Sequence, residues 1–366
     1  MASWRKARAQ CLLPGLLTAP DDFAVALLYF LSLWSALFAV YQAIEIPTGR
    51  NCALKVVDRY RCERLKKTAD LYMEKHCLLR TDHANIVKMF GWFSDNTSVF
   101  VVMEECMGGE LWEVVKTAGL PRSLARHYLP QVITALEYLR QANIVHRDLK
   151  AENIMLTDMG VVKLIDFGTA KDLENPQIKG SGNASRHKVF DNYVGTPQFM
   201  PAEVIENRSS DFRSDTWSLG CTIFQALTGC PPFHGASEYL IFTRIIEMDL
   251  QLPPGISPDA CDLIKRLVVS DADARLGAVD LGEVRRHPYF DGVEFEGLHE
   301  RPQPVMSLVD HCLRRIGKLM DNKFSAKLDV WDGRRKGLSD EVCAQIERMK
   351  LVHKWQDDVL PPEECR

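Results

Sequence analysis

The spacing of apolar residues changes along the chain and divides it into two structural halves. Residues 53–57 and 98–103 are short apolar runs of the kind that form buried strands. Residues 124–139 instead follow a helical repeat of apolar positions. Beyond about residue 205 the pattern is mostly helical, with a break at Gly-Cys-Pro-Pro, residues 229–232. Strands early and helices late predict an α+β fold, with a small sheet-rich lobe followed by a larger helical lobe.

One segment departs from this pattern, because residues 23–44 contain no charged side chain. A basic flank precedes it, formed by Arg5, Lys6 and Arg8. By length and apolarity the segment is typical of a membrane span, so one interpretation is a membrane anchor. The other is that residues 39–44 form a strand followed by a turn at 47–50. The two exclude each other. We favour the strand and expect residues 1–38 to be an atypical, apolar start that is joined incorrectly to the domain that follows.

The overall composition is that of a globular protein. Hydrophobic residues make up 46% and charged residues 26%, and 45 basic against 49 acidic side chains give a formal charge of −4. These values exclude a disordered chain, a collagen-like chain and a strongly basic nucleic-acid binder, so we expect no nucleic-acid partner. The 11 cysteines form no CxxC pair and no Cys/His cluster with zinc spacing. This favours free thiols in a reducing compartment and a cytoplasmic location.

The strongest chemical signal is His-Arg-Asp-Leu-Lys-Ala-Glu-Asn at residues 146–153, followed by Asp-Phe-Gly at residues 166–168. Phosphoryl transfer needs a group that accepts the hydroxyl proton of the substrate, and Asp148 can do this. Lys150 can neutralise charge on the phosphoryl group as it moves. We therefore take Asp148 and Lys150 as the candidate catalytic residues.

Two further residues of these motifs are candidate metal ligands. Asn153 and Asp166 carry the oxygen atoms that a hard, hydrated Mg²⁺ ion prefers. The two motifs at this spacing resemble the catalytic loop and the metal-binding triplet of eukaryotic protein kinases. The resemblance implies a bilobal protein-kinase fold, ATP and Mg²⁺ as cosubstrate and cofactor, and a structural role for His146, packed against Phe167.

The resemblance extends to an ATP-binding site. Lys55 matches the strand lysine that holds the α- and β-phosphates, and Glu74 matches the helix glutamate that pairs with it. Met103 takes the gatekeeper position, at the start of the hinge between the lobes. The remaining candidates surround the adenine and the ribose: Val40, Ala53, Glu104, Cys106, Glu110 and Met155. For Glu110, the alternative is to cap the helix that follows.

Other motifs imply structural roles and a substrate class. Glu203, in a Pro-Ala-Glu triplet that replaces the usual Ala-Pro-Glu, is expected to form a buried pair with Arg275. Asp215 is expected to brace the catalytic loop. Lys150 and Thr196 together favour serine and threonine over tyrosine as the residue that accepts the phosphate.

Three strings narrow the resemblance to the phosphoinositide-dependent protein kinases of the AGC group. They are DFGTAK at 166–171, YVGTPQF at 193–199 and GASEYLIF at 235–242, of which the last is the most specific. The resemblance implies a serine/threonine kinase whose substrates include activation loops of other AGC-type kinases. We expect the kinase domain at residues 39–292 and a helical tail at 293–366, without a lipid-binding domain.

The glycine-rich loop of the family is the clearest departure. Counting back from Lys55 places its glycines at Leu33, Ser35 and Phe38, whose side chains would obstruct a phosphate cradle. We therefore expect the small lobe to lack its proper first strand and glycine-rich loop. The alternative function that follows is a pseudokinase that acts as a scaffold with impaired nucleotide binding.

A second departure concerns activation. Asn192, next to Asp191, replaces the activation-loop serine whose phosphate would pair with Arg147. Either Asp191 is a weak substitute, or Ser181 or Ser185 takes over as the phosphorylated residue.

Partner expectations follow from the same resemblance. We expect protein substrates, especially other kinases, and membrane contact only through residues 23–44. The docking pocket of the family is only partly supported, because Leu71 is present but Cys62 and Glu63 stand where aliphatic residues are expected.

Overall fold

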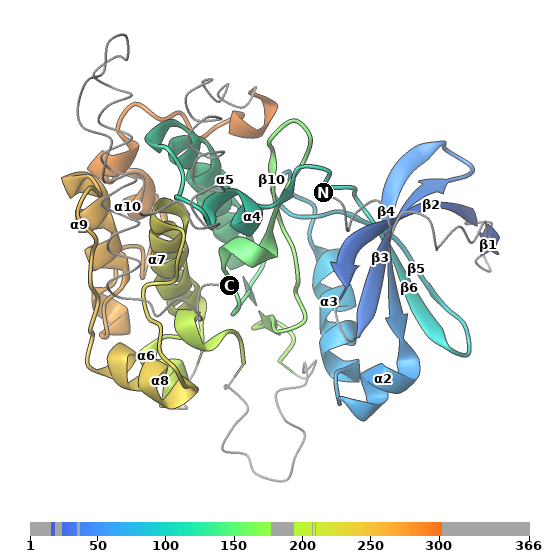
Figure 1. The fold of residues 1–366 in the computed structure, drawn as a ribbon, viewed down its shortest axis with the longest axis horizontal. Helices are drawn as coiled ribbons and strands as arrows, with labels where there is room; N and C mark the ends of the chain where they lie inside the picture. Colours follow the sequence, from blue (N-terminus) through green and yellow to red (C-terminus); the bar gives the residue numbers. More distant parts are fainter. Residues whose placement is uncertain are drawn as a thin grey trace, which may run out of the picture.

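The computed structural model has two lobes that differ in secondary structure. It describes residues 16–18, 24–34, 37–176, 194–206, 208 and 210–301, with the backbone alone for the first two of these ranges. Figure 1 shows a small lobe built on one twisted sheet with two helices, and a larger lobe built mostly of helices. The predicted α+β class and two-lobed arrangement are confirmed.

A six-stranded antiparallel sheet forms the small lobe, in the order β1-β2-β3-β4-β6-β5. The strands are β1 Leu16–Thr18, β2 Ala24–Trp34, β3 Phe38–Glu45, β4 Arg50–Asp58, β5 Met89–Ser94 and β6 Ser98–Met103. Val40 on β3 and Val101 on β6 lie on either side of Lys55 on β4. Val40 and Val101 are buried, so Lys55 emerges from an apolar sheet face.

The expectation that the small lobe lacks a first strand is wrong. β2 pairs with β3 in antiparallel fashion over its whole length, from Val25 opposite Glu45 to Trp34 opposite Ala39. An uncharged apolar run satisfies a buried strand as well as a membrane helix, and periodicity alone does not separate the two. Within the described part of the chain, no helix is both long and apolar enough to cross a bilayer.

Two helices follow β4 and pack beside the sheet (Figure 1). α2, Arg59–Arg64, begins where the Asp58 side chain accepts a hydrogen bond from the Arg61 N–H, at 2.9 Å. α3, Thr68–Arg80, buries one side of its surface, and this side includes Leu71, Cys77 and Glu74. The helix therefore presents a carboxylate to the interior together with its apolar residues.

The large lobe is organised around two long buried helices. Its helices are α4 Leu111–Val115, α5 Arg122–Gln141, α6 Ala202–Ile205, α7 Phe212–Thr228, α8 Glu238–Ile246, α9 Pro258–Leu267 and α10 Gly282–Arg285. α7 is buried along almost its entire length, with Trp217 fully enclosed. It ends at Gly229, whose left-handed backbone (φ 80°) suits glycine. The break predicted at residues 229–232 is confirmed.

Short strands and 3₁₀ turns complete the described structure. They are β7 Gly109–Glu110, β8 Ile144–Val145, β9 Ile154–Leu156, β10 Val162–Leu164 and β11 Lys171–Asp172, with the 3₁₀ turns η1 Ala151–Asn153, η2 Pro197–Phe199, η3 Ala272–Ala274, η4 Pro288–Phe290 and η5 Leu298–Glu300. β10, β9 and β7 form one sheet, and β11 pairs with β8. The predictions for Ser181, Ser185, Asp191 and Asn192, and for the tail beyond residue 301, lie outside the described residues.

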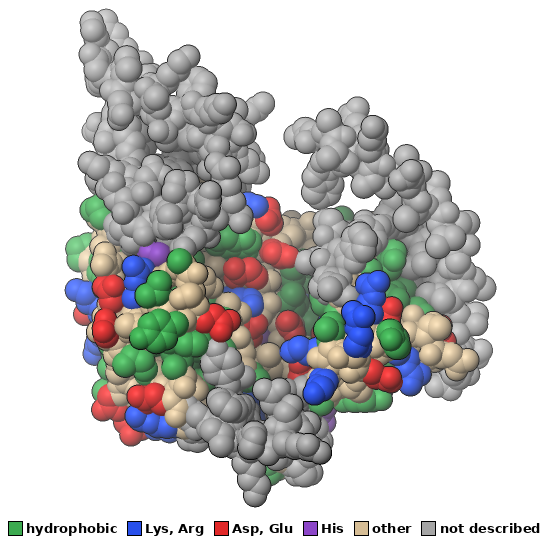
Figure 2. Space-filling model, turned by 60° about the horizontal axis from the view of Figure 1, so that its bottom comes forward, with side chains coloured by type: hydrophobic (Ala, Val, Ile, Leu, Met, Phe, Trp, Pro, Cys, Tyr) green, Lys and Arg blue, Asp and Glu red, His purple; other side chains and the backbone are tan. Residues whose placement is uncertain are grey.

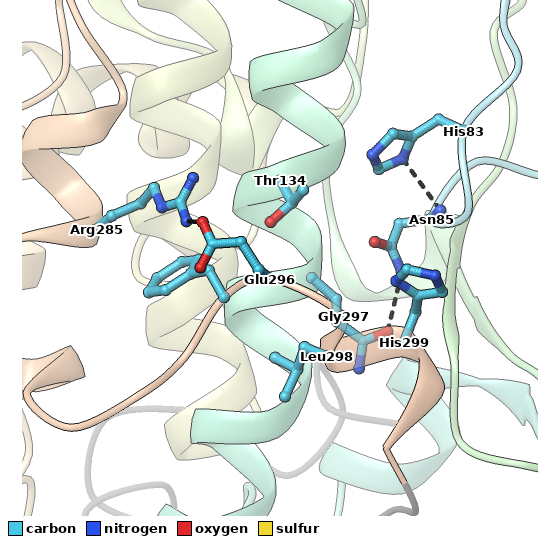
Figure 3. A pocket seen from close by; sticks show the side chains of 10 residues that line it. His83, Asn85, Thr134, Arg285, Glu296, Gly297, Leu298 and His299 are labelled. Carbon is cyan, nitrogen blue, oxygen red and sulfur yellow. Dashed lines mark hydrogen bonds and ion pairs between the residues drawn. The ribbon is translucent and has the colours of Figure 1, made fainter.

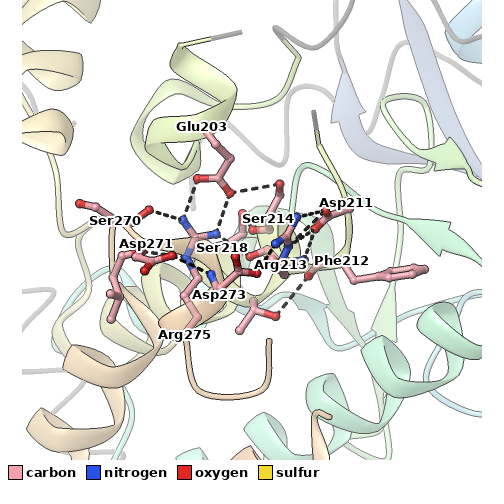
Figure 4. Close-up of polar contacts among 12 residues, drawn as sticks. Glu203, Asp211, Phe212, Arg213, Ser214, Ser218, Ser270, Asp271, Asp273 and Arg275 are labelled. Carbon is pink, nitrogen blue, oxygen red and sulfur yellow. Dashed lines mark hydrogen bonds and ion pairs between the residues drawn. The ribbon is translucent and has the colours of Figure 1, made fainter. Parts of the chain in front are cut away.

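A buried ion pair ties α6 to the turn after η3. Figure 4 shows Glu203 and Arg275 pointing toward each other. Each of the two guanidinium Nη atoms donates to a different carboxylate oxygen, at 2.7 Å. The predicted pairing is therefore confirmed. Arg213 joins the same region by binding Asp211 and Asp273.

Candidate functional site

The catalytic-loop motif lies between β8 and η1 and is held from below by α7. The Asp215 carboxylate accepts the backbone N–H groups of His146, at 2.7 Å, and Arg147, at 2.8 Å. These two bonds stabilise a left-handed backbone at Arg147 (φ 69°), which a non-glycine residue adopts only when its surroundings enforce it. The predicted bracing role of Asp215 is confirmed.

His146 packs as the resemblance implies. Its ring meets the Phe167 ring edge to face, with centroids 5.0 Å apart, and both side chains are fully buried. Its Nε2 lies 3.0 Å from the Ile165 carbonyl. The two motifs of the sequence are thus joined by a packed ring pair.

Asp148 is the most densely bonded group of the site. Its Oδ1 accepts the Thr196 N–H at 2.8 Å and the Thr196 hydroxyl at 2.7 Å. Its Oδ2 accepts from Lys150 Nζ at 2.9 Å and from Asn153 Nδ2 at 2.9 Å. Lys150 also binds the Thr196 hydroxyl. Four hydrogen bonds from three residues in two segments therefore fix one carboxylate.

These contacts keep the Asp148 carboxylate ionised. Burial by itself raises the pKa of Asp148, because it disfavours the charged form. The Lys150 ammonium, together with hydrogen bonds from Lys150 and Thr196, outweighs burial and lowers the pKa below its ordinary value. An ionised, oriented carboxylate is the form that a proton acceptor requires.

Lys55 and Glu74 meet across the small lobe. Lys55 Nζ lies 2.7 Å from each carboxylate oxygen of Glu74, and both side chains are buried. Burial lowers the pKa of Lys55, but the carboxylates of Glu74 and Asp166 raise it above its ordinary value. The ammonium is therefore charged at neutral pH, the form that attracts an anionic phosphate.

The two candidate metal ligands differ in exposure. The amide nitrogen of Asn153 is committed to Asp148, so its carbonyl oxygen is the atom left for an ion. Asp166 is exposed, and one of its oxygens accepts the Gly168 N–H at 3.2 Å. No group of three or more His, Cys, Asp or Glu side chains suited to a metal occurs among the described residues. Mg²⁺ needs none, since one or two protein oxygens with phosphates and water complete its shell.

The candidates for adenine line the opposite end of the site. Ala53 pairs with Met103 in the β4–β6 register, and Ala53, Val40 and Met155 are nearly buried. The Glu104 N–H is donated to the Lys88 carbonyl at 2.8 Å, so its own carbonyl is the group left for a base.

The other two hinge-side candidates are Cys106 and Glu110. Burial raises the pKa of the Cys106 thiol to about 12, which keeps it neutral. Glu110 lies directly before α4 but makes no side-chain cap hydrogen bond, and burial raises its pKa. The structure thus supplies no capping bond to explain Glu110.

The sequence analysis missed a polar cluster that links the lobes. Asp172 on β11 is fully buried and accepts hydrogen bonds from His76 Nε2, at 2.7 Å, and from Arg80, both on α3. Asn175 Nδ2 donates to the same oxygen at 2.9 Å. Arg80 also reaches the Ala142 carbonyl in the large lobe. A single acidic residue four positions after the Asp-Phe-Gly triplet carries no sequence signal for such a role.

Polar side chains gather where the lobes meet. Figure 2 shows acidic and basic side chains mixed in this region, with the helical lobe on the left and the sheet lobe on the right. Asp148, Lys150, Lys55 and Glu74 contribute charges of both signs to the candidate site. The structure brings the predicted catalytic and phosphate-side residues together from both lobes.

A separate cavity of about 120 Å³ lies between α5 and residues 295–299. Figure 3 shows His83, Thr134 and Arg285 around it, together with residues of the η5 segment. In its wall, Asn85 Nδ2 donates to a Gln131 oxygen at 2.9 Å. The lining of this cavity includes none of the predicted site residues, so we do not assign the reaction to it.

Comparisons with known proteins give a consistent result. Residues 37–290 match the family model described as "Protein kinase domain". The chain is 37% identical over 289 residues to 3-phosphoinositide-dependent protein kinase 1 of Arabidopsis thaliana, which covers 78% of this chain and 58% of that protein. It is 34% identical over 272 residues to the Homo sapiens protein of the same name, and the match covers 73% of this chain and 48% of that protein. It is also 34% identical over 272 residues to the putative 3-phosphoinositide-dependent protein kinase 2 of Homo sapiens, and this match covers 73% of this chain and 67% of that protein. The chain thus spans about half to two thirds of the length of these relatives.

Proposed function

We propose that this chain, which belongs to the protein kinase family, is a serine/threonine protein kinase. It resembles the phosphoinositide-dependent protein kinases. It would transfer the γ-phosphate of ATP to serine or threonine hydroxyls of protein substrates, among them the activation loops of other AGC-type kinases. The observation that carries the proposal is the Asp148 carboxylate, held by Lys150, Asn153 and Thr196 beside the exposed Asp166.

Each side chain has a defined task in this reaction. Asp148 accepts the proton of the attacking hydroxyl, and its bonds to Lys150 and Thr196 orient it for that transfer. Lys55, fixed by Glu74, holds the α- and β-phosphates. Asn153 and Asp166 supply oxygen ligands for Mg²⁺, which when bound neutralises charge on the phosphates.

Three substitutions test the assignment of roles. Asp148→Asn, Asp166→Asn and Lys55→Met should each abolish phosphate transfer, measured with radiolabelled ATP and a protein substrate. Asp158→Asn is the matched control, because Asp158 lies exposed in the turn between β9 and β10. Full activity in any of the first three variants would overturn the role given to that residue.

A second candidate is a scaffold with impaired nucleotide binding. The observation that favours it is the Phe38 ring, whose centroid lies 4.6 Å from Lys55 Nζ at the position expected for a loop glycine. The same assay on the unaltered chain separates the two candidates. Transfer supports the kinase, whereas nucleotide-independent binding of partners without transfer supports the scaffold.

A further inference from the structure

We propose that Phe38 determines how well the triphosphate of ATP is bound, because its ring takes the place beside Lys55 that a phosphate oxygen needs. The inference rests on the proposed function and deepens it. It predicts that the unaltered protein binds the adenosine part of the nucleotide normally and the phosphates weakly.

The strand register places Phe38 and Lys55 on one face of the sheet. Phe38 lies opposite Val57, and Val40 lies opposite Lys55, in the β3–β4 ladder. Residues two apart in a strand point to the same face. Phe38 therefore projects from the same face as Val40 and Lys55, one step closer to the tip of the β2–β3 hairpin.

The ring covers the ammonium group that should bind phosphate. An ammonium group has three N–H donors. Lys55 donates to both Glu74 oxygens, at 2.7 Å each, and the Phe38 ring lies over the same nitrogen with its centroid at 4.6 Å. This distance is within the range of a cation–π contact.

The spacing leaves no room for a phosphate oxygen between the two groups. Such an oxygen would sit about 2.8 Å from the nitrogen and about 3.5 Å from the ring, so it needs roughly 6 Å along that line. The observed 4.6 Å is shorter. A phosphate oxygen that approached Lys55 along this line would therefore have to displace the ring.

Movement of the ring is opposed by its apolar contacts. Phe38 packs against a buried cluster under the small-lobe sheet, formed by Val57, Cys62, Leu71, Val99 and Val101. Displacing the ring gives up these contacts together with the cation–π contact. Among the residues expected around adenine, Ala53 and Met103 lie on another rung of the ladder, where they face each other. Adenosine binding should therefore be independent of Phe38.

The chain offers a matched control on the other face of the same sheet. Arg50 lies 4.3 Å from the centroid of the Phe90 ring, which packs against the separate cluster of Ala43, Cys52, Leu54, Phe100 and Val102. Removing this ring deletes an aromatic–cation contact of similar geometry without opening space beside Lys55.

The experiment measures equilibrium binding of Mg·ATP and of adenosine to the full chain, by titration calorimetry. Phe38→Gly and Phe38→Ser should each tighten Mg·ATP binding by about tenfold, as expected for loss of a contact that competes with the phosphates, and leave adenosine binding unchanged. Phe90→Leu should change neither affinity. Thermal unfolding selects the variants that are folded, and the serine variant serves if the glycine variant is not.

The outcomes separate the inference from the function on which it rests. If folded Phe38 variants bind adenosine like the unaltered protein but bind Mg·ATP no more tightly, the inference is wrong and the ATP site stands. If neither the unaltered chain nor any variant binds adenosine, the proposed function is wrong and the inference falls with it. Equal tightening of Mg·ATP binding in Phe90→Leu would also overturn the inference.

Discussion

Thr196 donates both its backbone N–H and its hydroxyl to Oδ1 of Asp148, at 2.8 and 2.7 Å. Gly195 makes this approach feasible, because its φ of 107° is one that side-chain-bearing residues rarely adopt. A Cβ on Gly195 would also lie 2.6 Å from the Arg147 carbonyl. The segment before η2 is therefore fitted directly onto the Asp148 carboxylate, and under the proposed function the Thr196 hydroxyl orients the proton acceptor.

Replacing Thr196 with valine tests this contact, because valine keeps the shape and removes the hydroxyl. We expect kcat to fall by about tenfold, the value of one hydrogen bond to a charged group, with little change in KM for ATP. Thr196→Ser restores the hydroxyl and should restore most of kcat. Steady-state kinetics of the three proteins measure this. A Thr196→Val enzyme with unchanged kcat, or one that serine does not rescue, would contradict a positioning role.

Lys150 should set the acid limit of the reaction. Burial raises the pKa of Asp148, and the charge and hydrogen bond of Lys150 lower it below its ordinary value of 3.8. Activity needs ionised Asp148, so it is lost as pH falls through this pKa. In Lys150→Met the effect of burial remains, and the loss of activity should move to higher pH.

The measurement is kcat of this variant from about pH 5 to pH 8, where Asp148 of the unaltered enzyme stays ionised. Thr196, Asn153 and His146 also face Asp148 and are kept in both proteins. Lys116→Met, at an exposed lysine on the surface, is the control. A pH profile of Lys150→Met that is as flat as that of the unaltered enzyme over this range would refute the assignment.

Much of the fold follows from local pattern, because its elements carry strong periodicity. The strand at 98–103 and the long helix containing residues 124–139 occur where the spacing of apolar residues places them. The segment at 24–34 was harder to interpret. Its apolar run has no alternation, so only its pairing with β3, a tertiary contact, identifies it as a strand.

The candidate site likewise contains residues that the sequence predicts and contacts that it does not. The spacing of the two motifs was enough to select Asp148, and the resemblance to protein kinases selected Lys55 and Glu74. The bonds of Thr196 to Asp148 depend on how a distant loop folds back, and no local pattern encodes them. The Asp172 cluster is likewise formed by α3 and β11, segments about ninety residues apart in the chain.

Asp172 should stabilise the contact between α3 and the large lobe. Its buried carboxylate binds His76, Arg80 and Asn175, and these contacts lower its pKa although burial raises it. In Asp172→Asn, Arg80 loses its buried ionic partner and keeps the more exposed Glu174 and the Ala142 carbonyl. We expect a loss of about 2–3 kcal/mol in the free energy of unfolding at pH 7, because one of the paired groups is partly solvated.

The pH dependence of this difference follows from the direction of the shift. A lowered pKa in the folded state contributes stability above the ordinary value of 3.8, and this contribution disappears as pH falls through the folded-state pKa. Urea unfolding of both proteins at neutral and at acidic pH measures it. Asp158→Asn, at an exposed residue of the turn between β9 and β10, is the control. A difference between Asp172→Asn and the unaltered protein that grows toward low pH would contradict the assignment.

The stability that the Glu203–Arg275 pair provides should depend more on Arg275 than on Glu203. The Arg275 side chain is 0% exposed and that of Glu203 is 11% exposed. Arg275 also donates to the carbonyls of Val269 and Arg213, at 2.8 Å each, and stacks over the Trp217 ring. Removal of the arginine therefore leaves more groups without a partner than removal of the glutamate.

We expect Arg275→Met to cost about 3–5 kcal/mol and Glu203→Gln to cost less, since glutamine keeps one acceptor oxygen for the guanidinium. Arg275→Lys should not restore stability, because an ammonium group cannot make the two parallel bonds. A double-mutant cycle in urea gives the coupling energy of the pair. If Glu203→Gln were the more damaging change, or if lysine replaced arginine without loss, the stability would come from packing around Trp217 and not from the buried pair.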